Sequence, residues 1–120
     1  MQTILVADDE DFLRLLVKET LRQYRVIEAR DGDEALVLAR EAAPDLVILD
    51  WMMPGRPGPE VLASLRSHPS TRDLPVLMVT AKAGAAERAQ LLAAGATACR
   101  AKPFGTAMLR ASVEAILEKP

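Results

Sequence analysis

The chain has 120 residues, half of them apolar, and its 17 acidic and 15 basic side chains give a net charge of −2. This length suits one domain with a hydrophobic core of its own, and the apolar content argues against disorder. The nearly balanced charge argues against a general nucleic-acid binder, and the sequence shows neither an apolar run of roughly 20 residues, as a membrane helix needs, nor a secretory signal pattern.

Five short apolar runs predict strands. They are TILVA (3–7), YRVIEA (24–29), DLVILD (45–50), PVLMVT (75–80) and ATACRA (96–101). The first, third and fourth are almost entirely apolar, which is typical of strands covered on both faces. The second and fifth are more mixed, as expected at the edges of a sheet.

The segments between these runs have the apolar period of helices. Pro59 suits the first turn of the third helix, and an Ala-rich helix from about Ala85 to Ala94 should end at Gly95. The other apolar stripes are Leu13, Leu16, Val17 and Leu21; Ala35, Leu36, Ala39 and Ala43; Val61, Leu62 and Leu65; and Leu109, Val113, Ile116 and Leu117.

Strands alternating with helices predict an α/β fold: a doubly wound, five-stranded parallel sheet with five helices on both faces. The flavodoxin-like strand order 2-1-3-4-5 places the three most apolar runs inside the sheet. We expect a single domain over residues 1–120, with 118–120 as a point where a linker could begin.

Polar side chains follow four of the predicted strands. Asp8 and Asp9 come after the first strand, Asp50 after the third, Thr80 at the end of the fourth and Lys102 after the fifth. Parallel strands end at the same edge of a sheet, where ligands bind in folds of this class. We therefore expect these side chains to meet in one crevice.

The chemistry of this set suits a transferring phosphoryl group. Crowded carboxylates raise one another's pKa, and a hard divalent cation relieves that repulsion; an all-oxygen site suits Mg²⁺ better than zinc. Lys102 supplies a positive charge for phosphoryl oxygens, and Thr80 supplies a hydroxyl. An aspartate can itself be the nucleophile and form an acyl phosphate.

Each residue alone also has a plainer interpretation. Asp50 could be a helix cap or a solvated acid, and Asp11 and Asp33 could be caps and nothing more. Thr80 could be an ordinary β-branched strand residue, and Lys102 a solvated surface lysine. Only the complete set is specific.

Four motifs resemble the receiver domain of two-component response regulators. They are VADDE (6–10), PDLVILDWMMPG (44–55), VLMVTA (76–81) and KPF (102–104), in the family's order and spacing. The resemblance covers essentially the whole chain. It implies a phosphorylation-controlled signalling domain, which catalyses only its own phosphorylation and dephosphorylation and is no enzyme toward other substrates.

The resemblance implies roles for the acidic residues. Asp50 resembles the phosphoacceptor that takes a phosphoryl group from a histidine kinase. Asp9 and Asp50 resemble Mg²⁺ ligands, with Asp8 acting directly or through water and the backbone carbonyl of Met52 completing the set. Mn²⁺ is the alternative ion.

Other positions match the family's switch. Thr80 resembles the hydroxyl that swings to the phosphoryl group, and Lys102, joined to Pro103 by what resembles the family's cis peptide, resembles the lysine that pairs with it. Where the family usually carries Tyr or Phe, this chain has Cys99. The absent ring argues against a ring-swing relay, so switching could pass instead through the segment from Ala81 to 89.

The resemblance also implies partners. A sensor histidine kinase or phosphotransfer protein would supply the phosphoryl group, and an output domain or target protein would bind the face formed by the fourth helix, fifth strand and fifth helix. Arg100 and Arg110 are expected to be exposed there and are candidate contacts only, and a homodimer is left open. We expect neither direct nucleic-acid binding nor membrane contact. The lone Cys99 permits no internal disulfide and suits the cytoplasm.

Three alternatives remain open. A flavodoxin-like flavin carrier is disfavoured because three carboxylates repel a flavin phosphate and aromatic residues make up 3% of the chain. An aspartyl-phosphate phosphatase would want a second acid two residues after its nucleophile, where Met52 stands. A receiver that has lost phosphorylation and acts as a scaffold is the third, and Cys99 keeps it open.

Overall fold

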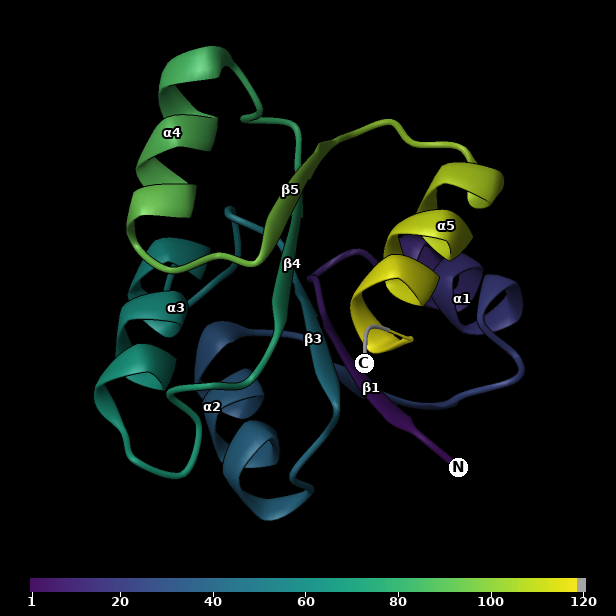
Figure 1. Ribbon diagram of the computed structural model, residues 1–120, viewed down its shortest axis with the longest axis horizontal. Coiled ribbons are helices and arrows are strands. Elements are labelled where there is room, and N and C mark those ends of the chain that lie inside the picture. The colour runs from purple at the N-terminus through teal and green to yellow at the C-terminus, as the bar shows by residue number, and fades with distance from the viewer. Residues whose placement is uncertain (119–120) are drawn as a thin grey trace.

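A five-stranded parallel sheet forms the centre of the molecule (Figure 1). The computed structural model describes residues 1–118, and strands and helices alternate along them. The elements are β1 (Thr3–Ala7), α1 (Asp11–Thr20), β2 (Arg25–Ala29), α2 (Gly32–Glu41), β3 (Leu46–Leu49), α3 (Gly58–Ser67), β4 (Val76–Thr80), α4 (Ala85–Ala93), β5 (Ala98–Ala101) and α5 (Thr106–Leu117). The strand order is β2-β1-β3-β4-β5, which confirms the predicted topology and its two edge strands.

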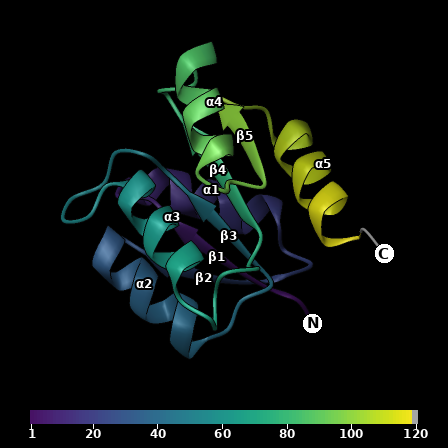
Figure 2. The ribbon, with the colours of Figure 1, turned by 60° about the vertical axis from the view of Figure 1, so that its left-hand side comes forward.

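The sheet divides the core into two apolar layers. Helices α2, α3 and α4 cover one face, and α1 and α5 cover the other (Figures 1 and 2). Because successive strand residues point to opposite faces, each inner strand contributes to both layers. On β1, Leu5 packs in the layer beneath α2–α4, whereas Ile4 and Val6 pack in the layer beneath α1 and α5. Every residue of β3 and β4 is buried, as their nearly continuous apolar sequences predicted.

Helix α1 buries a different face from the one its leucines predicted. Val17 and Leu21 are buried, but Leu13 and Leu16 are only partly buried. Arg14 takes their place inside, with 5% of its surface exposed. A guanidinium can be buried when its donors are paired, and Arg14 donates to two carboxylates and a carbonyl. The helix therefore turns a charged side chain toward the sheet.

Helix α2 ends earlier than its apolar stripe predicted. Its last residue is Glu41, and Ala43 lies outside the helix, exposed and with a φ of 44°. The residue before a proline is pushed out of the right-handed helical region, and Pro44 follows directly. Ala43 therefore cannot continue the buried stripe. The predicted end of α4 near Gly95 is confirmed, since Gly95 has a φ of 107°.

The helix caps also differ from the prediction. Asp31, not Asp33, caps α2, because its carboxylate accepts a hydrogen bond from the Glu34 N–H at 2.8 Å. Asp11 does not cap α1 but lies in its first turn and pairs with Arg14. Both errors are shifts of one or two positions in where a helix begins.

The carboxyl end of the chain is described as far as Glu118, the C-terminal cap residue of α5. The predicted linker start at 118–120 thus falls mainly on residues 119 and 120, which lie outside the described residues. Within residues 1–118, no helix combines the length and the apolar character needed to span a membrane.

Helix α3 begins directly against the backbone of Asp50. The Gly58 N–H donates a hydrogen bond to the Trp51 carbonyl at 2.7 Å. A Cβ added to Gly58 would lie 2.1 Å from the Asp50 carbonyl oxygen and 2.8 Å from the Trp51 Cα. Real side chains do not approach backbone atoms this closely, so glycine is required here by space.

We predict that Gly58→Ala lowers the free energy of unfolding by about 1–3 kcal/mol, because the backbone of Asp50 must move to admit the methyl group. Urea denaturation would measure the loss. Gly105→Ala is the matched control: a Cβ at Gly105 meets nothing within 4 Å, so its effect should stay below about 1 kcal/mol. Equal losses in the two variants would contradict the packing argument.

Candidate functional site

The ends of β1 and β3 lie level, which brings two buried acids side by side. Ala7 and Leu49 are register partners, and the Asp50 N–H donates to the Ala7 carbonyl at 3.1 Å. Asp8 and Asp50 therefore leave neighbouring strands together, with 2% and 6% of their surfaces exposed. One carboxylate oxygen from each, and one from the exposed Asp9, all lie within 4.8 Å of one another. The three predicted acids thus form one cluster.

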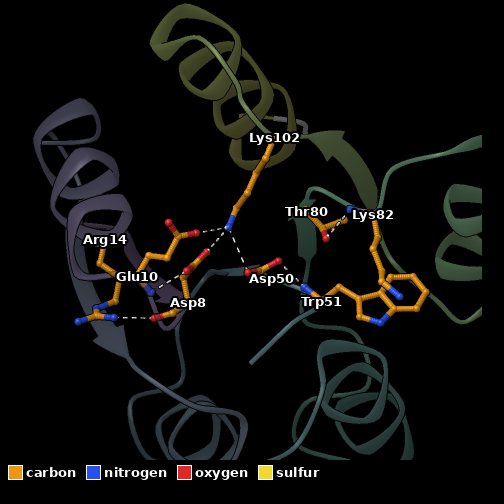
Figure 3. A network of polar contacts seen from close by, with 8 residues as sticks. All are labelled: Asp8, Glu10, Arg14, Asp50, Trp51, Thr80, Lys82 and Lys102. Carbon is orange, nitrogen blue, oxygen red and sulfur yellow. Dashed lines mark hydrogen bonds and ion pairs between the residues drawn. The ribbon is translucent and has the colours of Figure 1, made fainter. Parts of the chain in front are cut away.

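Lys102 reaches this cluster from the end of β5 (Figure 3). Its Nζ lies 2.7 Å from Asp8 Oδ2, 3.1 Å from Asp50 Oδ2 and 3.3 Å from Glu10 Oε1. The side chain is 14% exposed, and the peptide bond to Pro103 is cis. One ammonium therefore bridges acids from two strand ends. The sequence reasoning missed Glu10, whose only signal was its place in the acidic run after β1.

Burial and charge pairing oppose each other at this site. Burial raises the pKa of Asp8, and the hydrogen bond from Lys102 offsets only part of the rise. Burial would lower the pKa of Lys102, but its hydrogen bonds to Asp8 and Asp50 outweigh burial and raise the pKa to about 12. Lys102 is therefore a cation at every physiological pH. Lys102 pairs with three carboxylates, and Asp9 adds a fourth to the site, so the negative charge exceeds that of the one ammonium. The site therefore suits a further cation, and its all-oxygen donor set is of the kind that Mg²⁺ prefers.

Thr80 connects the site to the segment that leads into α4. It is 1% exposed, and its Oγ1 accepts a hydrogen bond from the Lys82 N–H at 3.1 Å. The Lys82 ammonium lies 5.4 Å from the centroid of the Trp51 ring, as a cation–π pair. The exposed Ala81 lies between Thr80 and Lys82. This segment therefore contacts both the threonine and the residue that follows Asp50 (Figure 3).

A hollow of about 400 Å³ opens beside Asp9. Met52, which is 60% exposed, lies on its lining, whereas the neighbouring Met53 is largely buried at 8%. The full lining is Asp9, Trp51, Met52, Met53, Pro54, Pro57 and Lys82. Most of the surface that borders Asp9 in this hollow is therefore apolar.

Cys99 stands in the apolar layer beneath α4. It pairs with Met78 in the sheet, is 2% exposed, and belongs to the same buried cluster as Leu91 of α4. Burial raises the pKa of its thiol. The position that carries an aromatic ring in many members of the resembling family is therefore filled here by a small, neutral side chain.

The face formed by α4, β5 and α5 differs from expectation at one residue. Arg110 is exposed, as predicted. Arg100 is half-buried: its Nε donates to Ser112 Oγ at 3.1 Å and its Nη1 donates to the Cys99 carbonyl at 2.8 Å. The expectation of an exposed Arg100 is therefore wrong, because its guanidinium ties β5 to α5.

Comparison with known proteins identifies the family. Residues 4–114 match the response regulator receiver domain. The chain belongs to this family. Receiver domains are the signalling domains of two-component systems, in which response regulators pair with histidine kinases and output domains.

Individual receiver domains show how far the similarity extends. The chain is 42% identical over 118 residues to the phosphate regulon transcriptional regulatory protein PhoB of Rhizobium meliloti, covering 97% of this chain and 52% of PhoB. It is 43% identical over 115 residues to the response regulator PleD of Caulobacter vibrioides, covering 94% of this chain and 25% of PleD. The chain thus spans about half the length of PhoB and a quarter of PleD.

The fold of this receiver domain matches a solved structure over nearly its whole length. The chemotaxis protein CheY4 of Vibrio cholerae superposes with a TM-score of 0.91 at 33% identity, covering 98% of this chain and 99% of CheY4. The doubly wound sheet described above is therefore the CheY-like form of the flavodoxin fold.

We predict that the Cys99 thiol of the folded receiver reacts with a maleimide at least roughly tenfold more slowly than in urea, because burial blocks access and suppresses the thiolate. The rate of mass gain at mildly alkaline pH, with and without denaturant, measures this. A native rate equal to the denatured rate would show that Cys99 is open to solvent.

Proposed function

We propose that this receiver accepts a phosphoryl group on Asp50 from the phosphohistidine of a sensor histidine kinase or phosphotransfer protein. The observation that carries the proposal is the position of the Asp50 carboxylate. It is buried, belongs to the acid cluster, and lies 3.1 Å from the ammonium of Lys102. A carboxylate oxygen would attack phosphorus while the bond from phosphorus to the histidine nitrogen breaks, and the imidazole would leave.

Lys102 and Thr80 have complementary parts in this proposal. The Lys102 ammonium would pair with the phosphoryl oxygens. It already lies at Asp50 Oδ2, so it is close to the position where their negative charge would develop. Thr80 donates its hydroxyl to the phosphoryl group once its side chain turns away from the Lys82 N–H. Both groups stabilise charge in a site that is largely shielded from water.

Mg²⁺, with Mn²⁺ as a substitute, would be held by Asp8, Asp9, Asp50 and the backbone carbonyl of Met52. The fit rests on the clustered carboxylate oxygens. When bound, the ion would neutralise the charge that develops on the phosphoryl oxygens. Both oxygens of Asp8 already accept hydrogen bonds, from the Glu10 N–H and from Lys102, so exposed Asp9 has the more available carboxylate.

The phosphoryl charge would switch the receiver between two states. Turning Thr80 toward Asp50 releases the Lys82 N–H, so the segment from Ala81 to 89 is free to move. Cys99 has no ring to swing, so this segment would carry the change to the face of α4, β5 and α5.

We propose that partners bind the face of α4, β5 and α5 and that the receiver acts in the cytoplasm. An output domain or target protein would bind there, with Arg110 as one contact, and a homodimer through the same face is a further arrangement. We propose no direct nucleic-acid contact for this domain, which we take to be a single receiver over residues 1–120. Its own catalysis would be limited to its phosphorylation and dephosphorylation.

The function is tested by intact mass spectrometry after incubation with Mg²⁺ and acetyl phosphate. We expect the parent to gain the mass of one phosphoryl group and Asp50→Asn to gain none, because the amide is a poor nucleophile. Omission of Mg²⁺ should suppress the gain. Asp73→Asn is a matched control, since Asp73 is an exposed acid outside the cluster and should leave the gain unchanged.

A folded parent that gains no mass under these conditions would favour the scaffold alternative that Cys99 keeps open. A coloured purified protein would favour a flavin carrier, and steady release of phosphate from phosphomonoesters would favour a phosphatase. Any of these three results would contradict the proposal.

We also predict that Met52→Asn loses the phosphoryl group several-fold faster than the parent. Exposed Met52 lies two residues after Asp50 on the hollow beside Asp9, where an apolar side chain excludes water and an amide would hold it. The decay of the phosphorylated mass after removal of acetyl phosphate measures the rate. Val37→Asn makes the same kind of change at a 50% exposed residue of α2 and should leave the rate unchanged. Loss from Met52→Asn at the parent rate would contradict the argument.

A further inference from the structure

Arg14 is a buried charge that the phosphoryl chemistry does not use. It lies on α1 and is 5% exposed. Burying a guanidinium costs free energy unless its donors are paired, so the direction of each donor is informative. Its Nε donates to Glu28 Oε1 on β2 at 3.1 Å, its Nη2 donates to Asp11 on α1, and its Nη1 donates to the Asp8 carbonyl at 2.6 Å. One planar fork therefore joins α1, β2 and the end of β1.

With the bond from Arg14, every polar atom of Asp8 takes part in a hydrogen bond. The Asp8 N–H donates to the Ala29 carbonyl at 3.1 Å, and its carbonyl accepts from Arg14. Its Oδ1 accepts from the Glu10 N–H at 2.9 Å, and its Oδ2 accepts from Lys102 at 2.7 Å. Figure 3 shows Arg14 and Lys102 approaching Asp8 from opposite sides. Arg14 is thus the side chain that fixes the backbone of Asp8, while Lys102 holds its carboxylate.

The direction of the Asp8 carbonyl sets the direction of the peptide that leads to Asp9. This peptide carries the two acids of the cluster that lie next to each other in the chain. Groups that orient metal ligands without touching the metal commonly change metal affinity by about 10–100-fold. Lysine could not replace the fork, because an ammonium cannot present donors in three fixed directions from one plane.

We propose that Arg14 is a positioning residue for cation binding at the acid cluster: by holding the Asp8 carbonyl, it fixes Asp8 and Asp9 in the arrangement that binds Mg²⁺. This inference rests on the proposed function for the ion itself. It extends that function to a residue of α1 outside the cluster.

A positioning role and a purely electrostatic role of Arg14 predict opposite changes in Mg²⁺ affinity when the side chain is replaced. Arg14→Met removes a positive charge near a cation site, takes from Asp11 its partner and leaves Glu28 paired with Lys18 only. Coulomb attraction alone would then strengthen Mg²⁺ binding. Loss of positioning would weaken it. The sign of the change therefore separates the two effects.

The experiment titrates Mg²⁺ into the full chain, by calorimetry and by Trp51 fluorescence, at a temperature where urea denaturation shows each variant to be folded. We expect Arg14→Met to bind Mg²⁺ about tenfold more weakly than the parent. Lys18→Met is the matched control: Lys18 lies one turn further along α1 and pairs with the same Glu28 at 3.4 Å, but it does not hold Asp8. We expect this control to bind as tightly as the parent or more tightly.

Arg14→Lys keeps the charge and provides a second test should Arg14→Met fail to fold. It should also bind Mg²⁺ more weakly than the parent, because an ammonium lacks the planar, spread donors with which the guanidinium reaches Glu28, Asp11 and the Asp8 carbonyl. Parent-like or tighter binding by a folded Arg14 variant, or an equal loss in Lys18→Met, would overturn the proposal and leave the proposed function intact. A parent that binds no Mg²⁺ would overturn both.

Discussion

The site depends on one largely buried ammonium placed between acids that would otherwise repel each other. Asp8 and Asp50 leave adjacent strands at the same level and are almost fully buried, so their charges are poorly solvated. Lys102 lies within hydrogen-bonding distance of both. This arrangement requires β1 and β3 at the centre of the sheet and β5 beyond β4, so the doubly wound order and the charge pairing are consequences of the same topology.

Much of this could be predicted from the sequence because apolar runs and strand ends have simple geometry. Three continuous apolar runs fixed the central strands, and polar residues directly after strands had to gather at one edge. Asp8, Asp50 and Lys102 meet there for that reason. The apolar period of a helix did not predict burial where hydrogen-bond partners determine which side chain is buried. Arg14 is buried because three acceptors surround it, and no apolar pattern signals such a site.

Other features escaped prediction because they depend on local backbone geometry. The cap of α2 falls at Asp31 and not two residues later, and Ala43 is outside the helix because proline follows it. The cation–π pair between Lys82 and Trp51 joins segments that are distant in the chain, and each residue taken alone is unremarkable. Family resemblance supplied the roles of single residues, whereas the bonds of Arg14 and Arg100 became visible only in three dimensions.

The contact between Lys102 and Asp8 joins residues 94 positions apart, nearly the two ends of the chain. A ribosome synthesises the chain from its amino end, so the acids emerge long before the lysine that pairs with them. Until β5 is in place at the edge of the sheet, Asp8 and Asp50 lack the ammonium that pairs with both of them. Synthesis of β5 and completion of this charge pairing are therefore coupled, and fragments that end before β5 lack the lysine that pairs with the acids.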